Sequence, residues 1–127
     1  MFEEYVELDE IKKQILYKKI KSWTEDTLTL EDGTVMEVYC SEQDCCASAG
    51  GTFKDIELDA TITDVNIGKK DTVESDWGSE SFADIVIYHN QNVIAKAECY
   101  ADNGNGGYYY SICALKVKNI QCVVVDQ

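Results

Sequence analysis

Cys45 and Cys46 most invite a chemical role, because they stand side by side in EQDCCASAGGTF (residues 42–53). Catalysis by a thiolate requires a base, normally a histidine that an acid or amide orients. His89 is the one histidine of the chain, and it lies in IYHNQNV, a stretch typical of a solvated hairpin turn. We therefore expect no catalytic dyad and assign no enzymatic activity.

A metal site is not expected either. Structural zinc needs four Cys or His ligands, usually with pairs at C-x-x-C or similar spacing. Cys40 precedes Cys45 by five residues, and His89 is the only histidine that could join them. Adjacent residues also point to opposite sides of an extended chain. We infer neither a metal nor a cofactor.

We interpret the segment instead as a structured loop with free thiols, with a place at the edge of a binding surface as one option. Asp44 or Ser48 would bond to local backbone amides, as short polar side chains do in turns. One cysteine of the adjacent pair would pack inward. Gly50 and Gly51 would let the chain reverse.

A second unusual stretch is NGNGGYYYS (residues 103–111), where Asn105 and Gly106 belong to a turn-forming run that permits positive φ angles. Three tyrosines follow, and on a strand Tyr109 faces opposite to Tyr108 and Tyr110. Two interpretations stay open. Tyr108 and Tyr109 are candidate partner-binding residues, because exposed tyrosine suits interfaces; alternatively, they pair across strands with Tyr88 or Tyr100.

Charge is the strongest signal of composition, since 24 acids face 11 basic residues, all lysines, for a net charge of −13. Such a surface is poorly suited to nucleic acid, which requires basic groups on the protein. It fits a partner protein with a basic surface, or it serves solubility alone. Acids are densest in the segment Asp55–Asp84, and the candidate partner-binding acids are Asp71, Glu74, Asp76 and Glu80.

The pattern of elements predicts a mainly β (α+β) fold, an antiparallel twisted sheet or partial barrel with one short N-terminal helix. Leu8, Ile11 and Ile15 recur at helical spacing within residues 6–20. An antiparallel meander is predicted from three short β-prone runs, KIKSW, TLTL and VMEVYC, with an Asp-Gly turn between the last two. Residues 56–68 predict a bend followed by a strand. KKDTVESDWGSES (residues 69–81) has no period and reads as a long polar loop.

Three strands are predicted in residues 82–117, with turns at residues 89–92 and 102–107. Val93, Ala95, Ala97 and Cys99 share the core face of the middle strand. Cys99, Cys113 and Cys122 lie in apolar stretches and are expected in the core.

The whole chain, residues 1–127, is expected to form one domain, and residues 1–7 are a candidate flexible tail. It contains no run of about 18 apolar residues, and its N-terminus is acidic where a secretory signal would be basic. We therefore expect a cytosolic protein with no membrane contact.

The elements DCCAS (residues 44–48) and NGNGGYYYS resemble motifs of a family of small uncharacterised phage and prophage proteins, which carry an early D/E-C-C-S/E and a late S-N-G-Y-Y-S/G element. TFKDI and LDATITDV follow the first element where the family has an aromatic, an acidic pair and a strand. The resemblance spans Lys19 to Tyr110 and implies a phage origin and a β-rich domain. It implies no biochemical activity.

Two hypotheses follow. The first is a non-enzymatic inhibitor that binds a host protein, a defence component such as a CRISPR effector or a TIR-domain enzyme, and occupies its basic surface. The second is a homo-oligomeric sponge whose Tyr-rich and Gly-rich loops enclose a nucleotide immune signal. The absence of arginine, the side chain best suited to phosphate, weighs against the second.

Overall fold

The computed structural model describes residues 4–44, 46–104, 107 and 109–127. Within them the chain forms one short helix and eleven strands, which confirms the mainly β expectation. In chain order they are β1 (Glu4–Tyr5), α1 (Leu8–Ile15), β2 (Ile20–Trp23), β3 (Thr27–Leu30), β4 (Val35–Gln43), β5 (Ala49–Lys54), β6 (Asp64–Ile67), β7 (Asp71–Ser75), β8 (Gly78–His89), β9 (Asn92–Asp102), β10 (Ser111–Val117) and β11 (Ile120–Asp126).

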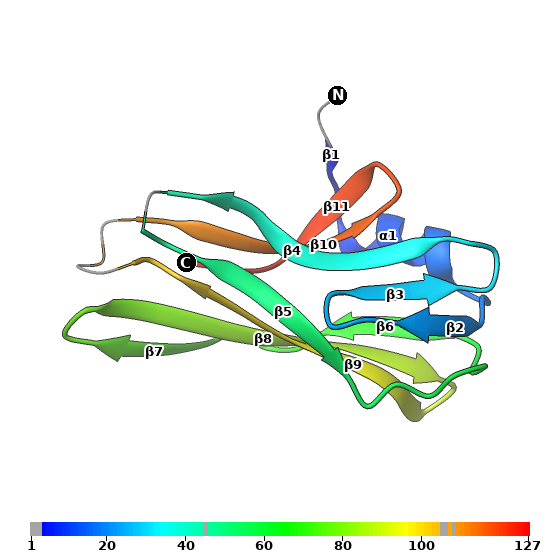
Figure 1. The fold of residues 1–127 in the computed structure, drawn as a ribbon. Helices are drawn as coiled ribbons and strands as arrows, with labels where there is room; N and C mark the ends of the chain where they lie inside the picture. The colour runs from blue at the N-terminus through cyan, green and yellow to red at the C-terminus, as the bar shows by residue number, and fades with distance from the viewer. Residues whose placement is uncertain (1–3, 45, 105–106, 108) are drawn as a thin grey trace.

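The strands divide between two sheets that stack face to face, as Figure 1 shows. The first sheet has the order β1-β11-β10-β4-β3-β2, and the second has the order β5-β9-β8-β6, with β7 also paired to β8. All pairs are antiparallel except the short parallel pair of β1 with β11. Part of the segment expected as a tail, Glu4–Tyr5, is therefore a strand.

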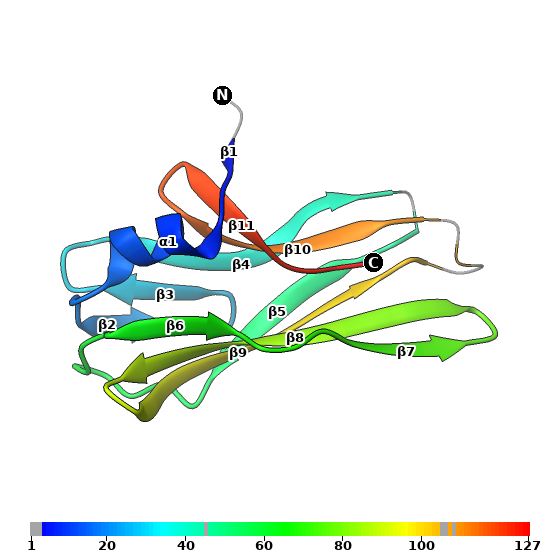
Figure 2. The ribbon, with the colours of Figure 1, turned by 180° about the vertical axis from the view of Figure 1, so that it is seen from behind.

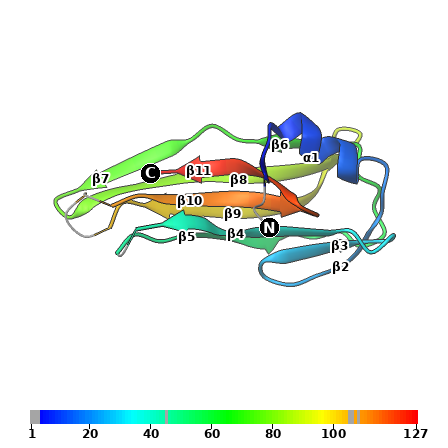
Figure 3. The same cartoon turned by 90° about the horizontal axis from the view of Figure 1, so that it is seen from above.

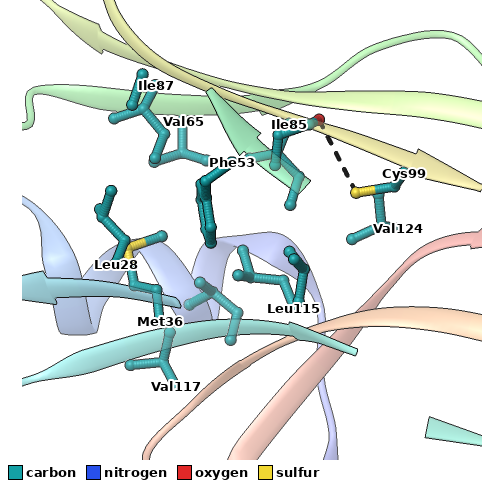
Figure 4. Close-up of a cluster of buried hydrophobic side chains, with 14 of the residues drawn as sticks. Leu28, Met36, Phe53, Val65, Ile85, Ile87, Cys99, Leu115, Val117 and Val124 are labelled. Carbon is teal, nitrogen blue, oxygen red and sulfur yellow. Dashed lines mark hydrogen bonds between the residues drawn. The ribbon is translucent and has the colours of Figure 1, made fainter. Parts of the chain in front are cut away.

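The core lies between the sheets and is built from residues that alternate along the strands. In β8 the buried positions are Ser81, Ala83, Ile85 and Ile87, every second residue. Figure 4 shows how apolar side chains of both sheets meet around Phe53 of β5, which is 1% exposed. Cys99, Cys113 and Cys122 are buried as predicted.

The helix α1 covers the edge of the sandwich beside β11 and β6 (Figures 2 and 3). Ile11 and Ile15 are fully buried there, so the predicted amphipathic face is confirmed. The helix is shorter than predicted, because Leu16 is already extended and Tyr17 adopts a φ of 68°. Among the described residues, no helix is long and apolar enough to cross a membrane.

Two turns lie where the sequence predicts them. β3 and β4 form a hairpin around Asp32 and Gly33, and β8 and β9 form a hairpin at residues 89–92. The core face of β9 holds Ala95, Ala97 and Cys99 as predicted. Ile94 is buried and Val93 exposed, because the register of β8 with β9 shifts at Ile87/Tyr88.

The predicted polar loop at residues 69–81 is instead a hairpin of β7 and the start of β8. Every residue of β7 is exposed, so the segment lacks the alternation that reveals a half-buried strand. This hairpin extends to the left end of the molecule in Figure 1.

Gly50 and Gly51 do not reverse the chain, because both lie within β5 and pair with β9. A Cβ at Gly51 would stand 2.8 Å from Cys99 Sγ, so the missing side chain permits close packing there. The predicted turn at residues 102–107, of which 105 and 106 lie outside the described residues, does not join two strands of one sheet. It links β9 of the second sheet to β10 of the first.

Candidate functional site

Three segments meet at one end of the sandwich: the residues after β4, the residues after β9, and the tip of the β7–β8 hairpin (left in Figure 1). The first two contain the two motifs that the sequence singles out. We call their meeting point the motif junction and define it by Ser48, Asp102, Asn103, Gly104 and Gly78.

Asp102 is the centre of the motif junction. Its carboxylate accepts hydrogen bonds from the backbone N–H and hydroxyl of Ser48, both at 2.9 Å, and from the backbone N–H of Gly104 at 3.1 Å. The Ser111 hydroxyl, which has one proton to donate, lies 2.9 Å from the backbone oxygen of Ser48 and 2.6 Å from that of Asp102. These bonds connect the first motif to the second. One carboxylate can do this because its two oxygens accept several hydrogen bonds at once.

Asn103 attaches the β7–β8 hairpin to the same centre. Its side-chain oxygen accepts from the backbone N–H of Ser79 at 2.7 Å, and its own N–H donates to the Ser79 oxygen at 3.1 Å. The second motif thus continues the pairing of β8 beyond the end of β9.

Two glycines make the close approach possible. A Cβ at Gly78 would lie 2.5 Å from the backbone oxygen of Gly104, and the φ of Gly78 is +151°. A Cβ at Gly104, whose φ is +76°, would lie 2.7 Å from Cδ2 of Tyr109. Side chains at either position would push the segments apart.

Beside the motif junction lies an open groove of about 440 Å³, lined by residues of the β7–β8 hairpin together with Cys46, Asp102 and Gly104. Three apolar side chains of the hairpin line it and are exposed: Val73 (56%), Trp77 (71%) and Phe82 (39%). Tyr100 of β9 lies directly opposite Phe82 and extends this aromatic surface across the sheet.

The four candidate acids all lie on the hairpin and are exposed, but they do not share one face. Asp71 pairs with Phe82 and Glu80 with Val73, so both acids flank the apolar side chains on the outer face of the sheet. Glu74 pairs with Ser79 and points to the opposite face, and Asp76 lies in the turn. We call Val73, Trp77 and Phe82 with Asp71, Asp76 and Glu80 the acidic-aromatic face.

The predicted loop around the adjacent cysteines differs in detail. Cys46 is exposed and Ala47, at 3% exposure, packs inward, while Cys45 lies outside the described residues. The Ser48 hydroxyl bonds to Asp102 rather than to a local amide, because the second motif lies against it. Asp44 joins the junction through its backbone, which bonds to Tyr110 and Ala47.

Four predicted site residues, Cys45, Asn105, Gly106 and Tyr108, lie outside the described residues. Tyr109 is partly buried and packs on Gly104. Tyr109 precedes β10 and lies outside the strands, and its backbone N–H donates to the Asn103 oxygen at 3.0 Å.

The geometry does not bring Cys46 to His89. Cys46 lines the groove with Gly78 at one end of β8, and His89 is the last residue of that strand, about 35 Å away at the usual rise of a strand. His89 Nδ1 instead lies 2.9 Å from the backbone oxygen of Thr61. Within the described part of the chain, no group of three or more His, Cys, Asp or Glu side chains could hold a metal ion.

The buried thiols are in environments that disfavour thiolates. Hydrogen bonding with Cys113, followed by burial, raises the pKa of Cys99. Burial raises the pKa of Cys122 to about 11 and also raises the pKa of Cys40. Since the thiolate is the reactive form, the buried Cys99 and Cys122 suit packing rather than catalysis, and the pKa of the half-buried Cys40 also favours its thiol form.

Sequence reasoning missed Val73, Trp77, Phe82 and Asp102. Trp77 sits in the Asp-Trp-Gly run of an acidic segment, and a large aromatic in such a turn signals exposure. No comparable signal exists for Asp102, whose partner Ser48 is 54 residues away.

The fold and site together define a β-sandwich domain whose two motifs form one hydrogen-bonded junction. The chain matches the family model DUF7448, a domain of unknown function, over residues 13–116, and it belongs to that family. The matched range includes the motif junction and the acidic-aromatic face. No curated protein and no solved structure matches the chain.

Proposed function

We propose that this protein is a non-enzymatic, phage-encoded inhibitor that binds a basic surface of a host defence protein through its acidic-aromatic face. The observation that carries the proposal is the exposure of Trp77, Val73 and Phe82 on a hairpin rich in carboxylates. Tryptophan is the residue most enriched among those that dominate binding energy, and acids around it would steer a basic partner.

Rigidity of the hairpin supports the proposal. The tip is held by Asn103 and by the close approach of Gly78 to Gly104, although every residue of β7 is exposed. A fixed surface loses less entropy on association than a loop that must become ordered. The hairpin would therefore present its aromatic side chains in a defined geometry.

The nucleotide sponge receives no comparable support. The described residues that line the groove include the carboxylates of Glu80 and Asp102 and no lysine. A phosphate placed there would meet negative charge, whereas phosphate sites use basic side chains or clustered amides.

The test is a phage-defence challenge in which the gene is expressed in trans in bacterial strains that each carry one defence system. We expect phage plating to recover in at least one strain. Trp77→Ala should abolish the recovery, because the loss of an aromatic anchor costs about 2 kcal/mol or more of binding free energy. The purified defence protein from the responding strain should then bind the chain directly.

Charge is tested on that purified pair. Replacing Asp71, Glu74, Asp76 and Glu80 by their amides should slow association and flatten its salt dependence. The matched control replaces four exposed acids outside the hairpin, Asp9, Glu25, Glu31 and Glu57, and changes the net charge equally. Equal effects of the two variants, or recovery of plating in no strain, would contradict the proposal.

A further inference from the structure

The outer edge of β7 has the backbone geometry to pair with a further strand. Among the described residues, β8 is the one strand that pairs with β7. A strand that pairs on one side presents alternate backbone N–H and C=O groups on its other side.

The residues that face outward can be identified from the bonds of β8. Ser79 exchanges hydrogen bonds with Asn103 through both its N–H and its C=O, on the side of β8 away from β7. Glu74, which lies opposite Ser79, therefore belongs to a pair without mutual hydrogen bonds, and its own backbone groups point outward. By alternation, the backbone groups of Thr72 point outward as well.

The side chains along this edge decide what can pair with it. The hairpin DTVESDWGSE (residues 71–80) holds four carboxylates and no lysine. A second copy would bring its own Asp71 and Glu74 against the same residues, and like charges opposite one another destabilise strand pairs. An extended segment with basic side chains would instead place opposite charges in register.

We propose that the basic partner docks on β7 by adding one of its own extended, lysine- or arginine-containing segments as a further strand of the second sheet. This inference rests on the proposed function and specifies how the partner is held. The outward N–H and C=O groups of Thr72 and Glu74 supply the main-chain hydrogen bonds. Val73 contacts the apolar side chain opposite it on the added strand.

The register of β7 specifies the partner segment further. Residues opposite one another in a sheet share a face, and Asp71 and Glu74 stand three positions apart on opposite faces. The added strand therefore has basic residues three positions apart, with an apolar or β-branched residue opposite Val73.

A synthetic peptide tests the mode of binding. The probe is a blocked Thr-Thr-Lys-Val-Thr-Lys-Thr-Thr, with a glutamate version as its charge control, titrated into isotope-labelled protein and followed by NMR. We expect the lysine peptide to bind, to shift the amide signals of Thr72 and Glu74 most, and to lose binding when its lysines become glutamates. Failure of the lysine peptide to bind at millimolar concentration would overturn the inference.

The decisive variant is Thr72→Pro, which removes an outward N–H without changing charge. Proline is tolerated on a strand edge whose N–H faces solvent. It should weaken peptide binding about fivefold or more, the effect of one lost hydrogen bond. Thr72→Val is the matched control, because it also loses the hydroxyl bond to Ser81 but keeps the N–H. Equal binding by both variants would overturn the inference.

Modified peptides test the same point on the unaltered protein. N-methylation of the alternate peptide residues whose backbone N–H groups point toward β7 should abolish binding. N-methylation of the residues between them, whose N–H groups point away from β7, should preserve it. Equal effects of the two patterns would also overturn the inference.

The defence challenge separates this inference from the proposed function. If Trp77→Ala loses activity and Thr72→Pro keeps it, edge pairing is refuted and the proposed function stands. If the wild-type protein is inactive, the proposed function is refuted.

Discussion

The two ends of this sandwich are held together by different kinds of interaction. At one end, α1 buries Ile11 and Ile15 against strands of both sheets, and the partly exposed Lys12–Asp64 ion pair adds a polar contact to this apolar packing. At the other end, the motif junction joins the sheets through the carboxylate of Asp102 and the close approach of Gly78 and Gly104.

This difference explains where the recognisable motifs lie. Apolar packing accepts several side chains of similar volume. The end with α1 is therefore recognisable in the sequence only as a periodic pattern of apolar residues. A hydrogen-bonded junction requires particular donors, acceptors and glycines at particular positions. The two motifs accordingly lie at the polar end.

The largest expected effect is at the apolar end. Ile15→Ala should lower the free energy of unfolding by about 3 kcal/mol, because it removes buried methylene groups and leaves a cavity. Urea unfolding measures it. The control, Ile15→Val, should cost about 1 kcal/mol. Similar costs for the two variants would show that this end does not depend on close packing.

Gly78→Ala should have the next largest effect, about 2 kcal/mol of unfolding free energy, from strain at a positive φ combined with the clash with Gly104. Gly33→Ala is its control, because Gly33 also has a positive φ, +91°, but a Cβ added there would meet no atom within 4 Å. Comparing the two by urea unfolding isolates the cost of the close approach. Equal costs would mean that the hairpin tip does not pack tightly on the motif junction.

Asp102→Ala should lower the unfolding free energy by about 2 kcal/mol, because two backbone amides and one hydroxyl lose their acceptor. Asp102→Asn should cost less, since its oxygen can still accept from the amides of Ser48 and Gly104. Calorimetric melting of the two variants measures the difference. An asparagine variant as unstable as the alanine variant would show that the charge, rather than the acceptor geometry, holds the junction.

The smallest expected effect concerns alkaline pH at the apolar end. Burial raises the pKa of Cys122 from 9.0 to about 11, so the folded state holds a proton that the unfolded state releases. Stability from this group is complete below the unfolded pKa and is lost as pH rises through the folded pKa. At pH 10 the loss is about 1 kcal/mol.

Urea unfolding between pH 8 and pH 11 measures this loss, since that window brackets the two pKa values of Cys122. The control is Cys122→Ala, whose unfolding free energy should fall less steeply over the same range, because the other titrating groups are unchanged. Parallel profiles would show that water reaches this thiol at the end covered by α1.

Local features of the sequence predicted much of the fold. The turn at Asp32–Gly33, the turn after His89 and the buried cysteines depend on residues adjacent in the chain or on their own apolar character. A turn forms where neighbouring residues favour its φ angles, and alternation marks a half-buried strand. These signals need no knowledge of distant partners.

Other elements of the fold depend on contacts between residues that are distant in the chain. β7 has no buried residue and so no pattern, and its pairing with β8 makes it a strand. Gly50 and Gly51 resemble a turn in the sequence, but the side chains of Cys99 and Tyr100 occupy the space that their missing Cβ atoms leave.

The candidate site shows the same division. Sequence patterns alone identify two polar motifs, the second of them rich in glycine, and a concentration of acids between them. Tertiary structure determined that β9 and β10 belong to different sheets, and that Ser48 and Asp102 therefore meet beside an exposed Trp77. The physical reason is that hydrogen bonds between residues 54 positions apart depend on how the two sheets stack, which no local pattern encodes.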